Sequence, residues 1–241
     1  MIKINLKLLL ILLLFSIAMG YLESAVVVYF RMIIMPAGLL FPINSISNQL
    51  IITEVLREMA TIIMLLTIAI IAGKSTREKL AWFIYCFGIW DIFYYVFLKL
   101  LINWPDSILS WDILFLIPLV WIGPVIAPAL VALLMVIFAL ILLQNTNNKP
   151  AHRILAISGS GLLVAGSIVV ISSFTLNFAQ ETLKQTTTGE WLGMLIKGTL
   201  YKLMPGYAPL KFNWPVFLTG FISLILGITL HFFSLRKTRP V

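Results

Sequence analysis

The chain has 241 residues, of which 61% are hydrophobic and only 11% are charged, and its mean hydropathy is +1.06. A soluble domain carries far more charge, so this composition excludes a water-soluble fold. The net charge of +8 comes from short basic clusters between apolar runs, a pattern that indicates membrane orientation and excludes nucleic-acid binding.

Six apolar runs are each close to the roughly 20 residues that cross a bilayer as an α-helix. They cover about 7–30, 50–72, 80–102, 124–143, 154–176 and 214–233. The sequence therefore predicts an all-α integral membrane protein, a single polytopic domain with six transmembrane helices. The first run also resembles a signal peptide, but apolar sequence resumes after Glu23, which favours an uncleaved first helix.

One apolar segment, residues 107–122, is too short to span the membrane with confidence and is interrupted by Asp112 and Pro118. We expect a short re-entrant or interfacial helix there. The alternative is a seventh span, which would place the two termini on opposite sides of the membrane.

Two outer connections are expected to lie at the membrane surface. In residues 189–204, apolar side chains alternate with Lys197 and Lys202, a pattern typical of an outer amphipathic helix. Residues 32–49 contain two prolines and are expected to form an apolar loop at the interface.

Basic residues predict the orientation, because short cytoplasmic connections collect Lys and Arg. With six spans, the side of the two termini holds Lys3, Lys7, Lys74, Arg77, Lys79, Lys149, Arg153, Arg236, Lys237 and Arg239. Glu78 is the only acid among them. We therefore expect six spans, with both termini in the cytoplasm and the protein in a bacterial-type plasma membrane. A seventh span would move one basic cluster outside.

Charged residues also occur inside the predicted spans. Glu54, Arg57, Glu58 and Thr61 follow one another at spacings of three and four, so they project from one face of the second span. Glu23 reaches a similar depth on the first span. A charge at the centre of the membrane costs about 2.5–3.5 kcal/mol, so such side chains normally face the interior of a bundle.

The third span adds Asp91 at its middle, and Asp112 of the short segment is expected to cap the same region from outside. The sequence thus predicts that the first three helices enclose a polar cavity in the outer half of the membrane. Its predicted site residues are Glu23, Glu54, Arg57, Glu58, Asp91 and Asp112.

Acids outnumber bases in this predicted cavity. The candidate bases are Arg31, Arg57 and Lys99, of which Arg31 and Lys99 are expected to extend to the outer interface. At least one carboxylate is left without a base, and we expect it to take up a proton or bind a cation. The alternative is that the charges only lock the helices together, with Tyr85, Tyr94 and Tyr95 donating hydrogen bonds.

Three functions fit these features. The first is transport or conduction of a proton, a cation or a small charged solute, with a gate around Pro118 and Gly123–Pro128. The second is a membrane-embedded enzyme acting on a lipid or isoprenoid through its carboxylates or Mg²⁺. The third is a structural or assembly subunit with a membrane-protein partner, or a homo-oligomer.

The sequence identifies no cofactor and contains no phosphate-binding loop and no HExxH, GxSxG or CxxC motif. ATP-driven transport by this chain alone and the common hydrolases are therefore disfavoured. His152 and His231 are expected at the surface, and Cys86 as a buried free thiol.

Small residues predict close helix packing on the last two spans. Gly161 and Ala165 lie four residues apart on the fifth span, and Gly220 and Gly227 lie seven apart on the sixth.

Overall fold

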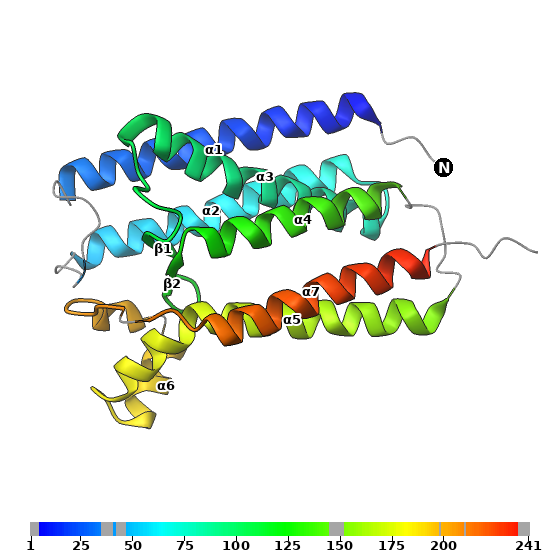
Figure 1. The fold of residues 1–241 in the computed structure, drawn as a ribbon. Helices are drawn as coiled ribbons and strands as arrows, with labels where there is room; N and C mark the ends of the chain where they lie inside the picture. The colour runs from blue at the N-terminus through cyan, green and yellow to red at the C-terminus, as the bar shows by residue number, and fades with distance from the viewer. Residues whose placement is uncertain are drawn as a thin grey trace, which may run out of the picture.

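The computed structural model describes residues 5–34, 41, 47–144, 152–197, 199–209 and 211–235. Six helices among these residues are long and apolar enough to cross a membrane (Figure 1): α1 (Leu6–Ile34), α2 (Asn48–Ala72), α3 (Thr76–Ile102), α4 (Ile126–Gln144), α5 (Arg153–Leu183) and α7 (Trp214–Ser234). Each corresponds to one predicted span, which confirms the all-α membrane fold.

Serine side chains cap the first turns of α2 and α3. Ser47 accepts a hydrogen bond from the N–H of Leu50 at 3.3 Å, and Ser75 accepts one from the N–H of Glu78 at 3.2 Å. These caps satisfy N–H groups that have no partner within the helix. They fix where each helix begins.

Helix α3 is central to the first four helices, because it packs against α1, α2 and α4. Its closest contact is with α4, where a Cβ on Gly88 would lie 2.7 Å from the carbonyl oxygen of Ala132. An apolar core that includes Leu12, Leu65 and the predicted buried thiol, Cys86, fills the end of this group nearest the first turn of α1. Apart from those in the first turns of α1 and α3, the charged side chains of these three helices lie in the other half of the group.

Glycines bring α5 and α7 together as an antiparallel pair (Figure 1). A Cβ on Gly166 would lie 2.9 Å from the carbonyl oxygen of Gly220, and a Cβ on Gly159 would lie 2.9 Å from that of Gly227. Contacts this short leave room only for hydrogen, so the two backbones approach as closely as helices can. The prediction for Gly220 and Gly227 is confirmed.

The predicted small face of α5 is wrong. Gly161 and Ala165 are exposed, and no atom lies within 4 Å of the position that a Cβ on Gly161 would take. Small residues occur on more than one face of α5, and their spacing does not indicate which face meets α7.

Residues 107–122 do not form the predicted helix. Strand β1 (Trp111–Phe115) pairs antiparallel with β2 (Trp121–Pro124), with Asp112 opposite Gly123. Pro118 lies between the strands, where its missing N–H interrupts no ladder, whereas in a helix it would remove a hydrogen bond. The paired strands satisfy each other's backbone groups, as buried backbone requires. The alternative of a seventh span is also wrong.

The amphipathic helix predicted at 189–204 is shorter in the structure. Helix α6 covers Thr188–Ile196 and is followed by a 3₁₀ turn, Leu200–Leu203. Thr187 and Glu190 form a capping box at its start. The indole N–H of Trp191 donates to the hydroxyl of Thr182 at 2.9 Å, which attaches α6 to the end of α5.

The first turn of α1 and the last turn of α7 lie at the same end of the bundle, as six spans require (Figure 1). At this end the N–H of His152 donates to the carbonyl oxygen of Ser234 at 3.3 Å, which joins the start of α5 to the end of α7. The hairpin and α6 lie at the opposite end. Most of the predicted interfacial loop, residues 35–40 and 42–46, lies outside the described residues.

Candidate functional site

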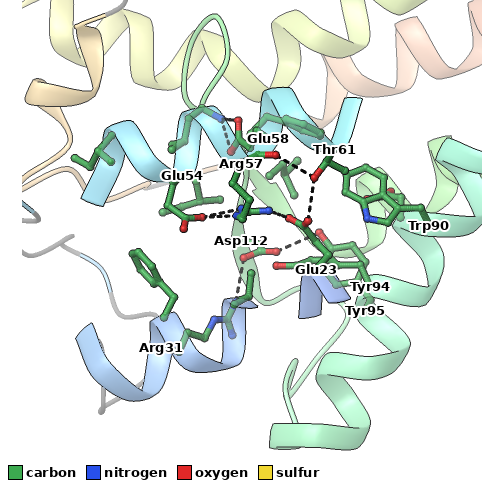
Figure 2. Close-up of a pocket in the computed structure, with 18 of the residues that line it drawn as sticks. Glu23, Arg31, Glu54, Arg57, Glu58, Thr61, Trp90, Tyr94, Tyr95 and Asp112 are labelled. Carbon is green, nitrogen blue, oxygen red and sulfur yellow. Dashed lines mark hydrogen bonds and ion pairs between the residues drawn. The ribbon is translucent and has the colours of Figure 1, made fainter. Parts of the chain in front are cut away.

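A cavity of about 130 Å³ lies between α1, α2, α3 and the hairpin (Figure 2). Its polar lining consists of Glu23, Arg31, Glu54, Arg57, Glu58, Thr61, Asp91, Tyr94, Tyr95 and Asp112. Val27, Phe30 and Ile51 contribute to an apolar wall. For comparison, an apolar cavity of roughly 150 Å³ accommodates benzene. The space is therefore sufficient for several water molecules or one small organic molecule.

The charged face of α2 points into this cavity. The guanidinium group of Arg57 pairs with Glu23 of α1, and its second nitrogen lies 2.7 Å from the carboxylate of Glu54. The hydroxyl of Thr61 donates to the other oxygen of Glu23 at 3.4 Å. Arg57 thus links α1 to α2 across the cavity and compensates two acids with one base.

Arg31 is buried, although it was predicted to extend to the outer interface. Its guanidinium lies 3.3 Å from a carboxylate oxygen of Asp112 on β1 and 3.8 Å from the ring centre of Trp104. The hydroxyl of Tyr95 donates to the other oxygen of Asp112 at 3.2 Å. A carboxylate and an aromatic ring inside the protein take the place of the interfacial water that an unpaired arginine would need.

Burial raises the pKa of Asp112 from its ordinary value of 3.8 to about 6. The positive charge of Arg31 and the hydrogen bond from Tyr95 act in the opposite direction, because both favour the ionised carboxylate. Asp112 therefore changes its charge in a mildly acidic range of pH.

Glu58 forms no ion pair with any base in the described part of the chain. It is 8% exposed, and its two carboxylate oxygens accept the backbone N–H of Leu116 at 3.0 and 3.1 Å. Leu116 directly follows β1, so the carboxylate satisfies a backbone donor at the end of the strand. This contact attaches α2 to the turn of the hairpin.

Asp91 lines the cavity from α3 and forms neither a hydrogen bond nor an ion pair with any residue that the structure describes. Beside it, Trp90 is 5% exposed and also lines the cavity, and its indole N–H has no acceptor among the residues that the structure describes. Polar groups buried in proteins are almost always hydrogen-bonded. Asp91 and Trp90 therefore present an unused charge and an unused donor at the same cavity.

The cavity is acidic. Five carboxyl groups but only two guanidinium groups line it. Lys99, the third candidate base, donates to the carbonyl oxygens of Asn103 and Pro105 at 3.2 and 2.9 Å and does not line the cavity. Glu58 and Asp91 are the acids without a pairing base within the described residues.

All six residues predicted for the site line this one cavity. The structure adds Arg31, Trp90 and the backbone N–H of Leu116. The spacing of Arg31, eight residues after Glu23 on the same helix, was the available signal for its position. Tyr85, which was expected to donate to a carboxylate, instead packs edge-on against Trp82 in the apolar core.

The two histidines differ. His152 is exposed as predicted, but His231 is buried against Phe138, because the end of α7 packs beside α4 and α5. Neither ring nitrogen of His231 has a hydrogen-bond partner in the described structure, and the residue does not line the cavity. Over the described ranges, no three His, Cys, Asp or Glu side chains are grouped so that they would hold a metal ion.

No protein-family model, curated protein or solved structure matches this chain. The chain is a multi-pass membrane protein. Large apolar side chains on its outer faces, such as Ile63, Ile71 and Ile168, are exposed for contact with lipid. Function is accordingly inferred from the geometry and charge of the cavity.

Proposed function

We propose that this membrane protein transports a small cation, the proton included, and that the cavity is its binding site. One observation carries the proposal: the carboxylate of Asp91 lines the cavity without a base or a hydrogen bond among the described residues. Ionisable side chains inside a membrane normally pair or mark the path of an ion.

The surrounding charges favour a cation over an anion. Arg57 is already bound by Glu23 and Glu54, and Arg31 by Asp112, so neither base is free to attract an anion. A cation would instead be attracted by Asp91 and Glu58, and poor screening inside the protein strengthens this attraction. The described carboxylates do not group as Mg²⁺ ligands would, which favours transport over the metal-dependent enzyme.

The turn of the hairpin is a candidate gate. Non-helical backbone is tolerated at membrane depth where it lines a cavity, and transporters use such elements at their binding sites. Glu58 holds the turn through the N–H of Leu116, so a cation that attracts this carboxylate would weaken the contact. Gly123 is fixed more tightly, because a Cβ there would lie 2.7 Å from the ring of Phe174. The moving part is therefore expected at 116–120.

Flux measurements test the proposal. Purified protein in liposomes is expected to dissipate an imposed gradient of protons or of a small monovalent cation. Asp91→Asn keeps the size of the side chain but removes its charge, so it is expected to reduce flux at least about tenfold. Asp106→Asn is the matched control, because Asp106 is exposed and lies outside the cavity. Wild-type flux no faster than that of protein-free liposomes, or undiminished flux in Asp91→Asn, would contradict the proposal.

A further inference from the structure

We infer that the cation is a small organic ammonium ion that also carries a hydrogen-bond acceptor. Its charged nitrogen binds Asp91, and its acceptor binds the indole N–H of Trp90. The inference rests on the proposed function, since it names the substrate class of the same cavity.

The positive charge of an ammonium group would complement the acidic side chains of the cavity. Asp91 lacks a counter-charge within the described chain, and Glu58 has only the N–H of Leu116. An ammonium nitrogen donates several hydrogen bonds to carboxylates, and such charge-assisted bonds are stronger than neutral ones. Trp90 and Tyr94 also line the cavity, and aromatic rings attract ammonium ions.

A hydrogen-bond acceptor on the ligand would pair with the second group that lacks a partner, the indole N–H of Trp90. The indole nitrogen of Trp90 is a donor only, and it is buried without an acceptor in the described structure. Figure 2 shows this nitrogen on the side of the indole that faces Glu23 and Tyr94. A hydroxyl or carbonyl oxygen on the ligand would accept a hydrogen bond from this N–H, whereas a simple alkylammonium ion has no acceptor to offer.

The lining favours an organic ion over an inorganic one. Val27, Phe30 and Ile51 give the cavity apolar walls, which would bury the carbon atoms of a ligand. A metal ion needs several oxygen ligands at once, and the described acids and histidines form no such group. The volume of about 130 Å³ limits the ligand to a molecule near the size of benzene.

Three probes of equal heavy-atom number separate the two requirements. Ethanolamine has the ammonium group and a hydroxyl acceptor, propylamine has only the ammonium group, and ethylene glycol has hydroxyl groups but no ammonium group. Titration calorimetry of the purified full chain at neutral pH is expected to rank them in this order. Ethanolamine should bind about fivefold more tightly than propylamine, as expected for one additional hydrogen bond, and ethylene glycol should not bind measurably.

Variants test which side chain binds the ammonium group and which binds the acceptor. Asp91→Asn is expected to weaken both amines at least about tenfold. Trp90→Phe keeps an aromatic ring but removes the N–H, so it is expected to abolish the fivefold preference for ethanolamine over propylamine, an effect that general destabilisation would not produce. Trp121→Phe is the matched control, because the indole N–H of Trp121 is also buried without an acceptor in the described part of the chain, but Trp121 lies outside the cavity. Circular dichroism and gel filtration confirm that each variant is folded.

A free ion and a lipid headgroup share this chemistry. Ethanolamine titrated into nanodiscs of phosphatidylglycerol, with and without phosphatidylethanolamine, distinguishes them. Weaker apparent binding when phosphatidylethanolamine is present assigns the site to the headgroup, and unchanged binding assigns it to the free ion.

The inference fails if ethanolamine and propylamine bind equally, or if neither amine binds more tightly than ethylene glycol. Cation flux that depends on Asp91, without amine binding, would contradict the inference and leave the proposed function standing. Amine binding without any cation flux would contradict the proposed function and leave the ligand class standing.

Discussion

Two opposing effects act on the carboxyl group of Asp112. Arg31 at 3.3 Å and the hydroxyl of Tyr95 at 3.2 Å both favour the ionised form. Its pKa is nevertheless raised to about 6, so the loss of water around the buried carboxyl group outweighs both contacts. A buried ion pair of this kind adds little net stability, although removing one partner leaves the other charge buried alone.

The free energy of unfolding is predicted to depend on pH through Asp112. Because the folded protein holds this proton more tightly than the unfolded chain, the stabilising contribution is fully present below about pH 4. It is lost as pH rises through about 6. The change is at most on the order of 3 kcal/mol, since one pKa unit corresponds to about 1.4 kcal/mol. Thermal unfolding measured across this range, compared with Asp112→Asn, isolates the contribution.

Arg31→Gln tests, by the same measurement of thermal unfolding, whether the charge of Arg31 acts on the pKa of Asp112. The charge of Arg31 lowers the pKa of Asp112, so its removal is expected to move the loss of stability to a higher pH. An unchanged midpoint would show that the ion pair does not act on this carboxyl group.

Side-chain spacing identified the acids around the cavity but not their partners. The spacings of three and four along α2 show that Glu54, Arg57 and Glu58 share a face. They do not show that Glu58 accepts a backbone N–H from the hairpin, because that contact joins residues 58 positions apart. The burial of Arg31 depends in the same way on Asp112, which is 81 positions away.

At the scale of the element, the hairpin was missed because its composition is as apolar as that of a membrane helix. A signal was present: Trp111–Phe115 and Trp121–Pro124, two short segments that each contain an aromatic residue and an isoleucine, flank Pro118. The six spans were predictable, because each must cover the thickness of the bilayer whatever its neighbours are.

The α5–α7 contact gives a prediction for a whole element. A Cβ on Gly166 would lie 2.9 Å from the carbonyl oxygen of Gly220 and 3.0 Å from the backbone nitrogen of Leu224, so Gly166→Leu forces the helices apart. We expect a loss of about 3 kcal/mol, at the upper end of the cost of overpacking. Thermal unfolding in detergent, with gel filtration, measures this effect.

Gly161→Leu is the control for that substitution. It removes a glycine from the same helix and brings the same gain in helix propensity, but its side chain enters open space. It should leave stability unchanged or slightly increased. Equal stability of the two variants would show that the helices are less closely packed at Gly166 than the structure has them.

At the scale of the whole molecule, some helices line the cavity and others support the hairpin. The cavity belongs to α1, α2, α3 and the hairpin, and no residue of α5 or α7 lines it. The α5–α7 pair instead supports the hairpin, because β2 packs against α5 at Gly123 and Phe174. The place of the cavity among the first three helices was predictable from their charged residues. The support of the hairpin by α5 was not, because it depends on contacts between segments far apart in the sequence.

The orientation of the bundle decides which compartment the cavity faces, and labelling of single cysteines measures it. Lys74 lies in the connection between α2 and α3, and Lys79 lies in the first turn of α3, so this end is expected in the cytoplasm. With Cys86 replaced by alanine, Asp106→Cys should react with an impermeant maleimide on intact cells, and Thr76→Cys only after permeabilisation. Both positions are exposed, and the parent without cysteine is the blank. The reverse pattern would place the hairpin and the acidic cavity on the cytoplasmic side, so the proposed cation would be drawn from the cell interior.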